Sequence, residues 1–574
     1  MDARLAPLSR RRSAAAFLLY GTAAAAFLGL ELAFHRGGRT YLGIGADPQI
    51  GLWAFGWWPH AILHGQNPIV THAIWAPDGV DLAWTAGTVP ALALAFAPLT
   101  LLVGAFASFQ VAYVLMPALA AWAAFLLCRH LTRAFWPAFA GGWLFGFSSY
   151  VLGQLQGHVF LTAVFALPLL ALAVLRFLDG ELGPRGLALR CGVLVAVQLA
   201  ISTEVAFTAT LALAVALVLG LVLAPARRRR IVAAAPALLG AYVLAAAIDA
   251  PLLWYWVSDF RRGRVNPASP DTFALDALNL VVPTPVTALG HWWVGSVDAR
   301  FTAGHAESGA YLGLPLLAIL GIELARRRRT AAARFLLAAF LVTAAAASGT
   351  WLRVDGHRLV TMPWEHVGYL PLFDDVLPAR LSVYLALVAA VGAAGFAASA
   401  SSPRAARAGL VALAAVAIAP NPTLRWTTVA HEPAFIADGL YQRCLRRGED
   451  VAVFPFSRHG DSMLWQVDAG FWFRQSGGYV APLPPPSFTT PPGVADVSSF
   501  GLRSEAEPGP LLELVRLKHV DVVLVDSARS EPWRSLLRGV RTPRAVGGVL
   551  LYRFRGTTPA ACAAATVPSV DVER

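Results

Sequence analysis

The sequence predicts a polytopic α-helical membrane protein of 11 to 13 spans, followed by a C-terminal extracytoplasmic α/β domain. Of its 574 residues, 57% are hydrophobic and only 14% are charged, whereas about 25% of a soluble protein is charged. Long apolar runs recur as far as residue 420, and such runs are typical of membrane-spanning helices. Beyond residue 420 polar and charged residues occur throughout, and no run there is long enough to span.

The positive net charge of +12 has a topological interpretation. Arginine clusters at residues 227–230, 326–329 and 404–407 separate apolar runs, and loops with such clusters stay on the cytoplasmic side of a membrane. No basic stripe interleaves with a soluble fold, so we do not expect a nucleic acid partner.

The N-terminal residues predict a retained first span. Arg10, Arg11 and Arg12 precede an apolar run over residues 14–34, which lacks a clear cleavage site before Glu31. We therefore expect a cytoplasmic tail at residues 1–13 and a first helix that crosses the membrane outward. The next loop, residues 35–87, then lies outside.

This first outer loop combines polar and aromatic residues. It carries Asp47 followed by Pro48, three histidines, and four tryptophans before residue 76. Residues 49–64 have the length of a helix and an aromatic face, which predicts a helix in the membrane interface, where Trp rings are favoured. The sequence Gly-Gln-Asn-Pro at residues 65–68 would end it.

The later apolar runs lead to a parity problem. They lie at residues 88–106, 110–128, 137–154, 159–178, 187–203, 206–224, 231–254, 309–325, 333–348, 380–399 and 408–420. With the first span this makes twelve runs, whereas an inside N-terminus and an outside C-terminus require an odd number. Either residues 88–106 are re-entrant or residues 137–154 do not fully cross, so we expect 11 or 13 spans in a transmembrane domain at residues 14–420.

Residues 421–574 predict a separate α/β domain. Short β-branched runs at residues 451–454, 520–525 and 549–552 predict strands, and residues 511–518 predict a helix. Cys444 and Cys562 fall in this region and could pair if it is extracytoplasmic, although the sequence does not show that they meet. Cys128 and Cys191 lie in or beside apolar runs and are expected to be packing residues.

Asp47 is the leading catalytic candidate. A carboxylate a dozen residues beyond the first span suits a general base that takes a proton from an acceptor hydroxyl. A partly desolvated site would raise its pKa toward a useful value. The alternative is a turn residue, because Asp-Pro commonly starts a turn.

Three further residues are candidates for substrate binding at the outer ends of spans. Arg380 could clamp a phosphate through paired hydrogen bonds, or it could simply snorkel to the interface. His158 could bind a phosphate or orient the acceptor, or it could have no role. Glu307 could bind a sugar or cap a helix. Arg261, Arg262 and Arg264 form a second candidate patch.

Two other patterns have weaker implications. His60 and His64 share a helix face and could bind a metal, but no HExxH frame accompanies them, so we expect no metal and no cofactor; His60 is kept as a substrate-binding candidate. Residues 475–479, with the sequence Gln-Ser-Gly-Gly-Tyr, could stack a sugar ring, although a hairpin turn is favoured.

Three passages together resemble bacterial polytopic glycosyltransferases of the GT-C superfamily. They are Ala-Asp-Pro-Gln at residues 46–49 with the tryptophans behind it, the segment at residues 141–150 leading to Gly157 and His158, and the entry into a span at residues 377–380. The similarity covers most of residues 1–400 as a pattern, and it is most specific in the first outer loop.

The resemblance implies a sugar donor on a polyprenyl phosphate and transfer on the outer face of a bacterial inner membrane. An acidic residue in the first outer loop is the expected base, and Asp47 matches it. The family often has a second acidic residue in the next outer loop, where this chain offers His158. That departure favours a metal-free, inverting displacement onto an envelope glycan or lipid.

Two other functions remain open at the level of sequence. One is a transporter or flippase for a lipid-linked glycan, although ionisable residues are scarce within the spans and a coupled transporter usually buries them near the midplane. The other is a non-catalytic subunit of an envelope-assembly complex, with the C-terminal domain as its docking module.

Overall fold

A computed structural model describes residues 10–34, 39–85, 87–258, 271–293, 297–400, 403–480, 484–498 and 508–563. These residues form two compact units, each drawn from several parts of the chain. We call the first the helical unit; it comprises the described residues within Met1–Phe34, Val111–Pro251 and Asn266–Trp426. The second, the mixed unit, comprises those within His35–Gln110, Leu252–Val265 and Thr427–Arg574. The predicted first outer loop therefore belongs to the same compact unit as the C-terminal α/β region.

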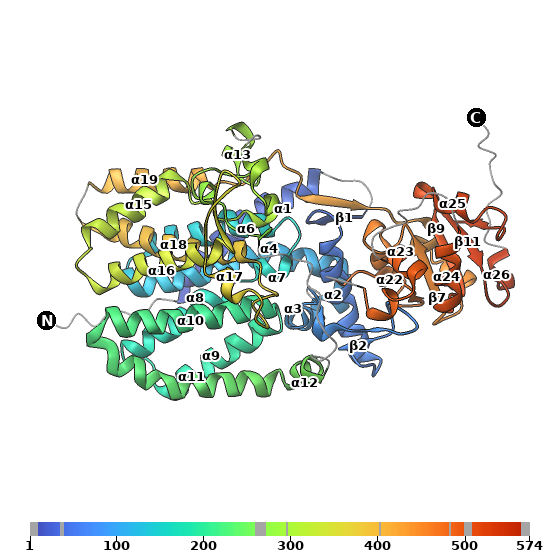
Figure 1. Ribbon diagram of the computed structural model, residues 1–574, viewed down its shortest axis with the longest axis horizontal. Coiled ribbons are helices and arrows are strands. Elements are labelled where there is room, and N and C mark those ends of the chain that lie inside the picture. The colour runs from blue at the N-terminus through green and yellow to red at the C-terminus, as the bar shows by residue number, and fades with distance from the viewer. Residues whose placement is uncertain are drawn as a thin grey trace. The chain divides into compact units, whose positions relative to one another are not determined.

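The helical unit consists of helices and one hairpin. Its helices are α1 (Arg10–Phe34), the part of α4 (Ala97–Thr132) from residue 111 onward, α5 (Phe135–Gly146), α6 (Ser149–Gln154), α7 (Val159–Thr162), α8 (Ala166–Leu178), α9 (Pro184–Leu199), α10 (Thr203–Leu223), α11 (Arg228–Ile248), α13 (Ala288–Trp293), α14 (Gly304–Glu307), α15 (Gly313–Arg326), α16 (Ala331–Ala347), α17 (Trp364–Val367), α18 (Ser382–Ala398) and α19 (Arg404–Ala417). Strands β4 (Trp351–Val354) and β5 (His357–Thr361) pair antiparallel. Helix α9 packs against α8, α10 and α11 (Figure 1). Helix α18 packs against α5, α15 and α16.

Six helices among the described residues are long and apolar enough to cross a bilayer. They are Arg10–Ala33, Ala97–Thr132, Val159–Leu178, Thr203–Leu223, Pro225–Ile248 and Pro378–Ala398. The chain is thus a multi-pass membrane protein, and the predicted class, polytopic and α-helical with a sheet-containing C-terminal region, is confirmed. The number of spans, 11 or 13, stays a prediction, because several expected runs form shorter helices.

The two runs suspected on parity grounds are both interrupted. The run at residues 88–106 divides into α3 (Pro90–Ala95) and the start of α4 (Ala97–Thr132), and α4 itself is broken at Gly104, whose φ of 86° and ψ of 160° are not helical. The run at residues 137–154 is split between α5 and α6 at Phe147. Either break shortens a segment that would otherwise be long enough to span.

The mixed unit begins with short elements of the first loop. They are β1 (Arg39–Leu42), α2 (Asp47–Leu63), β2 (Val70–Thr71), β3 (Val80–Asp81) and α3, and α12 (Ala250–Ser258) and the start of α4 contribute to this unit. Strand β1 pairs antiparallel with β6 (Thr427–Ala430), so that Leu42 lies opposite Thr427. This pairing joins the first loop to the start of the C-terminal region.

The C-terminal region is built on a five-stranded sheet with the order β10-β11-β9-β7-β8. Its strands are β7 (Asp450–Phe454), β8 (Arg474–Gln475), β9 (Val522–Asp526), β10 (Arg544–Val546) and β11 (Val549–Arg553). Strand β7 runs parallel to both β8 and β9, and β11 is antiparallel to β9. The predicted strands at residues 451–454, 520–525 and 549–552 are confirmed as β7, β9 and β11.

Short helices accompany this sheet (Figure 1). They are α20 (Ala434–Ala437), α21 (Tyr441–Cys444), α22 (Ser462–Asp468), α23 (Pro492–Ser498), α24 (Gly509–Leu517), α25 (Trp533–Leu536) and α26 (Ala560–Ala563). Helix α24 confirms the helix expected at residues 511–518. Cys444 and Cys562 form a disulfide that joins α21 to α26, which settles the pairing left open by the sequence, and Cys128 and Cys191 are buried and free.

The predicted helix of the first loop is present as α2, but the expected exposure of its aromatic face is wrong. Trp53, Trp57 and Trp58 are at most 5% exposed. The Trp53 indole donates a hydrogen bond to Gln466 Oε1 on α22 (2.8 Å), and Phe471 packs edge-on against Trp53 and Trp57. The tryptophans pack into the mixed unit, because α22 and the turn after it cover the face that was expected to meet lipid.

Candidate functional site

Asp47 is the first residue of α2. A carboxylate in this position is stabilised by the partial positive charge at a helix N-terminus. Its side chain is half-buried, and the Tyr479 hydroxyl donates a hydrogen bond of 2.6 Å to Asp47 Oδ1. The candidate base is therefore held by a residue of the C-terminal region, which lies 432 positions further along the chain.

Tyr479 is held in its protonated, donating form. Burial raises the pKa of its phenol, and the negative charge of Asp47 raises the pKa further. The guanidinium of Arg458 also hydrogen-bonds the phenol and partly offsets these effects. At neutral pH the Tyr479 hydroxyl can therefore only donate to Asp47, and Arg458 supplies a positive charge beside the pair.

The segment that carries Tyr479 is not the predicted hairpin turn. It continues from β8 and pairs with residues 73–76 of the first loop: Trp75 N donates to Gly477 O, and Ala76 N donates to Gln475 O (2.8 Å each). Gly478 has a φ of 150°, and a Cβ there would lie 2.9 Å from Ile74 Cβ. The Gly-Gly step thus permits a close approach to the first loop, which brings Tyr479 to Asp47.

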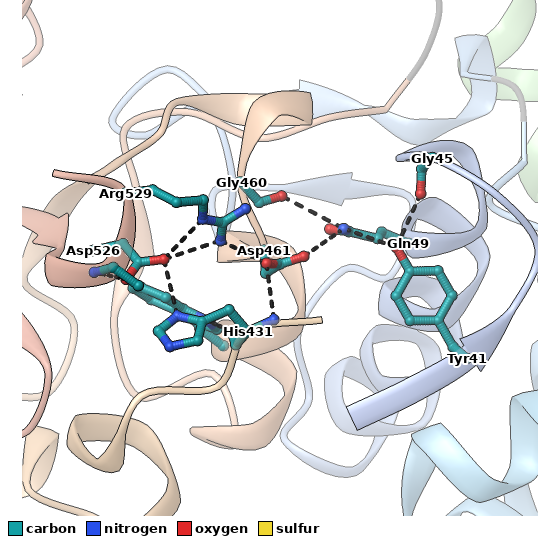
Figure 2. Close-up of polar contacts among 10 residues, drawn as sticks. Tyr41, Gly45, Gln49, His431, Gly460, Asp461, Asp526 and Arg529 are labelled. Carbon is teal, nitrogen blue, oxygen red and sulfur yellow. Dashed lines mark hydrogen bonds and ion pairs between the residues drawn. The ribbon is translucent and has the colours of Figure 1, made fainter. Parts of the chain in front are cut away.

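A second polar contact holds the first turn of α2. Gln49 Nε2 donates to the Tyr41 hydroxyl (3.2 Å), to Asp461 Oδ1 (3.1 Å) and to Gly460 O (3.5 Å) (Figure 2). The Tyr41 hydroxyl in turn donates to Gly45 O (2.9 Å). These bonds fix the backbone on both sides of Asp47.

Asp461 leads into a network of charged side chains in the C-terminal region (Figure 2). Arg529 Nη2 donates to Asp461 Oδ2 (2.6 Å), and Arg529 Nε donates to Asp526 Oδ2 (3.0 Å). The His431 backbone N–H donates to Asp461 Oδ2 (3.1 Å), and its Nδ1 lies 2.9 Å from Asp526 Oδ2. Asp526 is fully buried and Asp461 is 7% exposed, so this network orders the loops that meet α2.

The other predicted site residues meet in the helical unit, around Arg380. Its Nη1 lies 2.5 Å from Glu204 Oε2, its Nη2 lies 2.5 Å from Glu307 Oε1, and its Nε donates to Glu307 Oε2 (2.9 Å). All three side chains are at most 15% exposed. Glu204 was missed as a candidate, because in the sequence it is an isolated charge near a span end with no motif around it.

Glu307 links this ion pair to His158. Gln154 Nε2 donates to Glu307 Oε2 (2.9 Å), and Gln154 Oε1 lies 2.8 Å from His158 Nδ1. Because that amide oxygen can only accept, His158 Nδ1 is the donor. Burial alone would raise the pKa of Glu307, but the adjacent positive charge of Arg380 lowers the pKa to about 2. Glu307 is therefore ionised at neutral pH.

The cluster changes what Arg380 can do. Two carboxylates use three of its five N–H groups and offset its charge, so two N–H groups remain for a further ligand. The structure brings His158, Glu307 and Arg380 together, as a shared role requires. The phosphate-binding role of Arg380 stays a prediction.

His60 lies elsewhere, on α2 in an aromatic environment. Its ring stacks on His64 (centroids 4.1 Å apart) and lies 4.6 Å from the ring of Phe471. Burial lowers the pKa of His60 to about 4, with further contributions from His64 and Arg447. A neutral imidazole results at pH 7, which suits hydrogen bonding to a sugar better than pairing with a phosphate. Arg261, Arg262 and Arg264 lie outside the described residues.

Solved membrane glycosyltransferases share this fold. The arabinofuranosyltransferase AftD from Mycobacteria aligns with a TM-score of 0.56 at 15% identity, over 96% of this chain and 40% of AftD. The Archaeoglobus fulgidus oligosaccharyltransferase in its apo form aligns with a TM-score of 0.50 at 13% identity, over 90% of this chain and 69% of that enzyme. At such identities the likeness is one of fold, and it confirms the GT-C architecture expected from the sequence.

Comparison of the sequence with known families identifies the family of this chain. No curated protein matches this sequence. A family model described as a domain of unknown function, DUF6311, matches residues 19–419. Because that match covers more than half of the chain, the protein belongs to the DUF6311 family.

Proposed function

We propose that this protein is a membrane glycosyltransferase that moves a sugar from a polyprenyl-phosphate donor to an envelope glycan or lipid on the outer face of the bacterial inner membrane. The observation that carries the proposal is the Asp47 carboxylate, held at the start of α2 by the Tyr479 hydroxyl (2.6 Å) in a chain with the GT-C fold. The chain spans 40% of the length of AftD, and the donor and acceptor classes proposed here follow from the resemblance of its sequence to GT-C glycosyltransferases.

Asp47 acts as the general base in this reaction. Its carboxylate takes the proton of an acceptor hydroxyl as that oxygen attacks the anomeric carbon of the donor sugar. The new bond joins the acceptor oxygen to that carbon, and the bond between the same carbon and the phosphate oxygen breaks. Polyprenyl phosphate leaves with the electron pair, and the single displacement inverts the anomeric centre. Positioning and charge stabilisation can supply most of the rate, because a phosphate is an adequate leaving group.

The remaining predicted residues are proposed to bind substrate. His158 Nδ1 donates to Gln154, which leaves its Nε2 as an acceptor, and Glu307 is an ionised acceptor in the same hydrogen-bonded group. Both suit the hydroxyl donors of a sugar. Arg380 retains two N–H groups beyond the three that Glu204 and Glu307 occupy, and these could reach a phosphate oxygen. His60, neutral at pH 7, would hydrogen-bond a sugar.

Transfer by the purified protein tests the proposal directly. Radiolabelled polyprenyl-phosphate sugars are incubated with the full chain and envelope extracts, and the labelled product is isolated. Asp47→Asn is expected to lower transfer by about 100- to 10,000-fold, the usual contribution of a general base, while donor binding is retained. The matched control is Asp81→Asn in the same loop; Asp81 caps a turn by accepting from Ala83 N, and Asn caps equally well.

Three outcomes would contradict the proposal. Undiminished transfer by Asp47→Asn would remove the proposed base. Movement of a labelled lipid across vesicles without transfer would indicate the flippase. Absence of both, with loss of a partner protein when residues 421–574 are deleted, would indicate an assembly subunit.

A further inference from the structure

The C-terminal sheet has an edge of the kind that binds ligands in other α/β proteins. Its parallel strands β7, β8 and β9 all end at this edge, and β8 and β9 lie on opposite sides of β7. The connections that follow β7 thus lead first to the strand on one side of it and then to the strand on the other side. In open α/β sheets, the crevice beyond the strand ends at such a switch point is the usual ligand site.

In this protein the start of α2 lies at that edge. The loop after β7 supplies Gly460 and Asp461, which hold Gln49. The segment after β8 supplies Tyr479, which holds Asp47. The turn after β9 supplies Arg529, whose guanidinium donates to Asp461 Oδ2 (Figure 2). All three strand ends therefore converge on one turn of helix.

We propose that the C-terminal α/β region positions the Asp47 carboxylate, and that Tyr479 is the positioning residue in direct contact with it. This inference rests on the proposed function and extends it, because it assigns to residues 421–574 a part in the chemistry in place of a cover or a docking module. The sheet edge holds part of the catalytic machinery where other α/β sheets hold a ligand.

Three hydrogen bonds carry out the positioning. The bond from Tyr479 fixes one oxygen of the Asp47 carboxylate and so sets the direction in which the other oxygen points. The bonds of Gln49 to Asp461 and Tyr41 fix the first turn of α2, from which the carboxylate projects. The ionisable groups that face Asp47 from the C-terminal region include Tyr479 and Arg458, with Asp461 beyond Gln49.

Replacing Tyr479 with Phe removes one oxygen and separates positioning from packing. The hydrogen bond favours the charged form of Asp47, so its loss raises the pKa of that carboxylate. The acid limb of the pH profile of kcat should then move to higher pH, and kcat should fall by about 10- to 100-fold, the effect of losing a bond to a charged group. KM for the donor should stay unchanged, because Tyr479 acts on the base.

The matched control is Tyr441→Phe in the same region. Tyr441 is buried, and its hydroxyl accepts from Gln442 Nε2 (3.3 Å) away from α2. The Tyr441→Phe variant should be slightly less stable, and its kcat and the acid limb of its pH profile should be unchanged. A second variant, Gln49→Met, removes the bonds to Asp461 and Tyr41 without touching the carboxylate, and should lower kcat by less and leave the acid limb unmoved.

The outcomes separate this inference from the function on which it rests. A wild-type chain that transfers no sugar overturns both. Transfer that survives Asp47→Asn overturns the proposed base. If Asp47→Asn is inactive but Tyr479→Phe keeps the wild-type acid limb and kcat, only the inference is overturned. If Tyr479→Phe does not accumulate, an unchanged kcat in Gln49→Met overturns it instead.

Discussion

Two carboxylate sites, one in each unit, differ in what stabilises their charge. Glu204 and Glu307 are closed around the guanidinium of Arg380 by contacts of 2.5–2.9 Å, and that charge holds the pKa of Glu307 near 2. Such a carboxylate is too weakly basic to take a proton at neutral pH. Asp47 is half-buried and accepts from a phenol that stays protonated, which orients it without cancelling its charge.

The difference separates carboxylates that stabilise the packing of the helical unit from the carboxylate that we propose as the base. Buried, charge-matched side chains over-determine the packing around them, and breaking such a pair leaves an uncompensated charge. The Tyr479 phenol is neutral, so its bond to Asp47 opposes protonation of that carboxylate less than the Arg380 charge opposes protonation of Glu307. A ranking by burial and by shifted pKa values alone would place the Arg380 cluster first as the active site, whereas the chemistry required of a base favours Asp47.

The largest effect on stability is expected from Arg380→Met. It leaves two buried carboxylates without the positive charge of Arg380, which typically costs about 3–5 kcal/mol. The midpoint of thermal unfolding should fall accordingly. Adding Glu204→Gln and Glu307→Gln to this variant should restore much of the loss, because the stranded charges are removed. The exposed pair of Arg300 and Asp355 gives the control: Arg300→Ala should cost less than about 1 kcal/mol.

A different result for Arg380→Met would show that Arg380 binds a ligand. If Arg380→Met unfolds at the wild-type temperature and loses only donor binding, Arg380 is a ligand clamp and the cluster is functional. The phosphate-binding role predicted from the sequence would then be restored.

The next largest effect is expected at the disulfide of the mixed unit. Cys444 and Cys562 close a loop across 118 positions, and removing a native disulfide typically costs about 2–5 kcal/mol. Cys444→Ala with Cys562→Ala should lower the unfolding midpoint, and reductant should lower it in the wild type but not in the double variant. Cys191→Ala is the control, because Cys191 is reduced and buried in the helical unit. Equal sensitivity of wild type and double variant to reductant would contradict the pairing.

The sequence supports the prediction of local elements and of Asp47, because their signals lie within short segments. Strands β7 and β9 are continuous β-branched runs, which are typical of strands buried on both faces. Helix α2 starts at an Asp-Pro pair, and proline is favoured in the first turn of a helix. These features need no knowledge of the rest of the chain.

Contacts between distant segments could not be predicted in the same way. Tyr479 reaches Asp47 only because β8 ends at the sheet edge that receives α2, and Glu204 reaches Arg380 across 176 positions. Each residue looks like an isolated polar group at the end of an element. The aromatic face of α2 was misassigned for a related reason: a stripe of tryptophans has the same spacing whether it faces lipid or protein.

The smallest effect concerns the acid range over which each unit loses stability. Burial lowers the pKa of His60 from 6.5 to about 4, so between these values the unfolded chain binds more protons than the folded one. Its contribution to stability is fully present above pH 6.5 and is lost as the pH falls toward 4. For Glu307, lowered from 4.5 to about 2, the same sign applies, but the loss begins below pH 4.5. The mixed unit should therefore begin to weaken at a higher pH than the Arg380 cluster does.

His60→Gln tests this ordering. It should reduce the fall in the free energy of unfolding between pH 6.5 and 4.5 by roughly 1 kcal/mol, a value reduced for the partial exposure of the ring. Gln66 on the same loop is exposed and does not titrate, so Gln66→Asn supplies the control and should keep the wild-type slope. An identical slope in His60→Gln and wild type would mean that burial does not hold His60 neutral, and that a protonated His60 is available to pair with a phosphate.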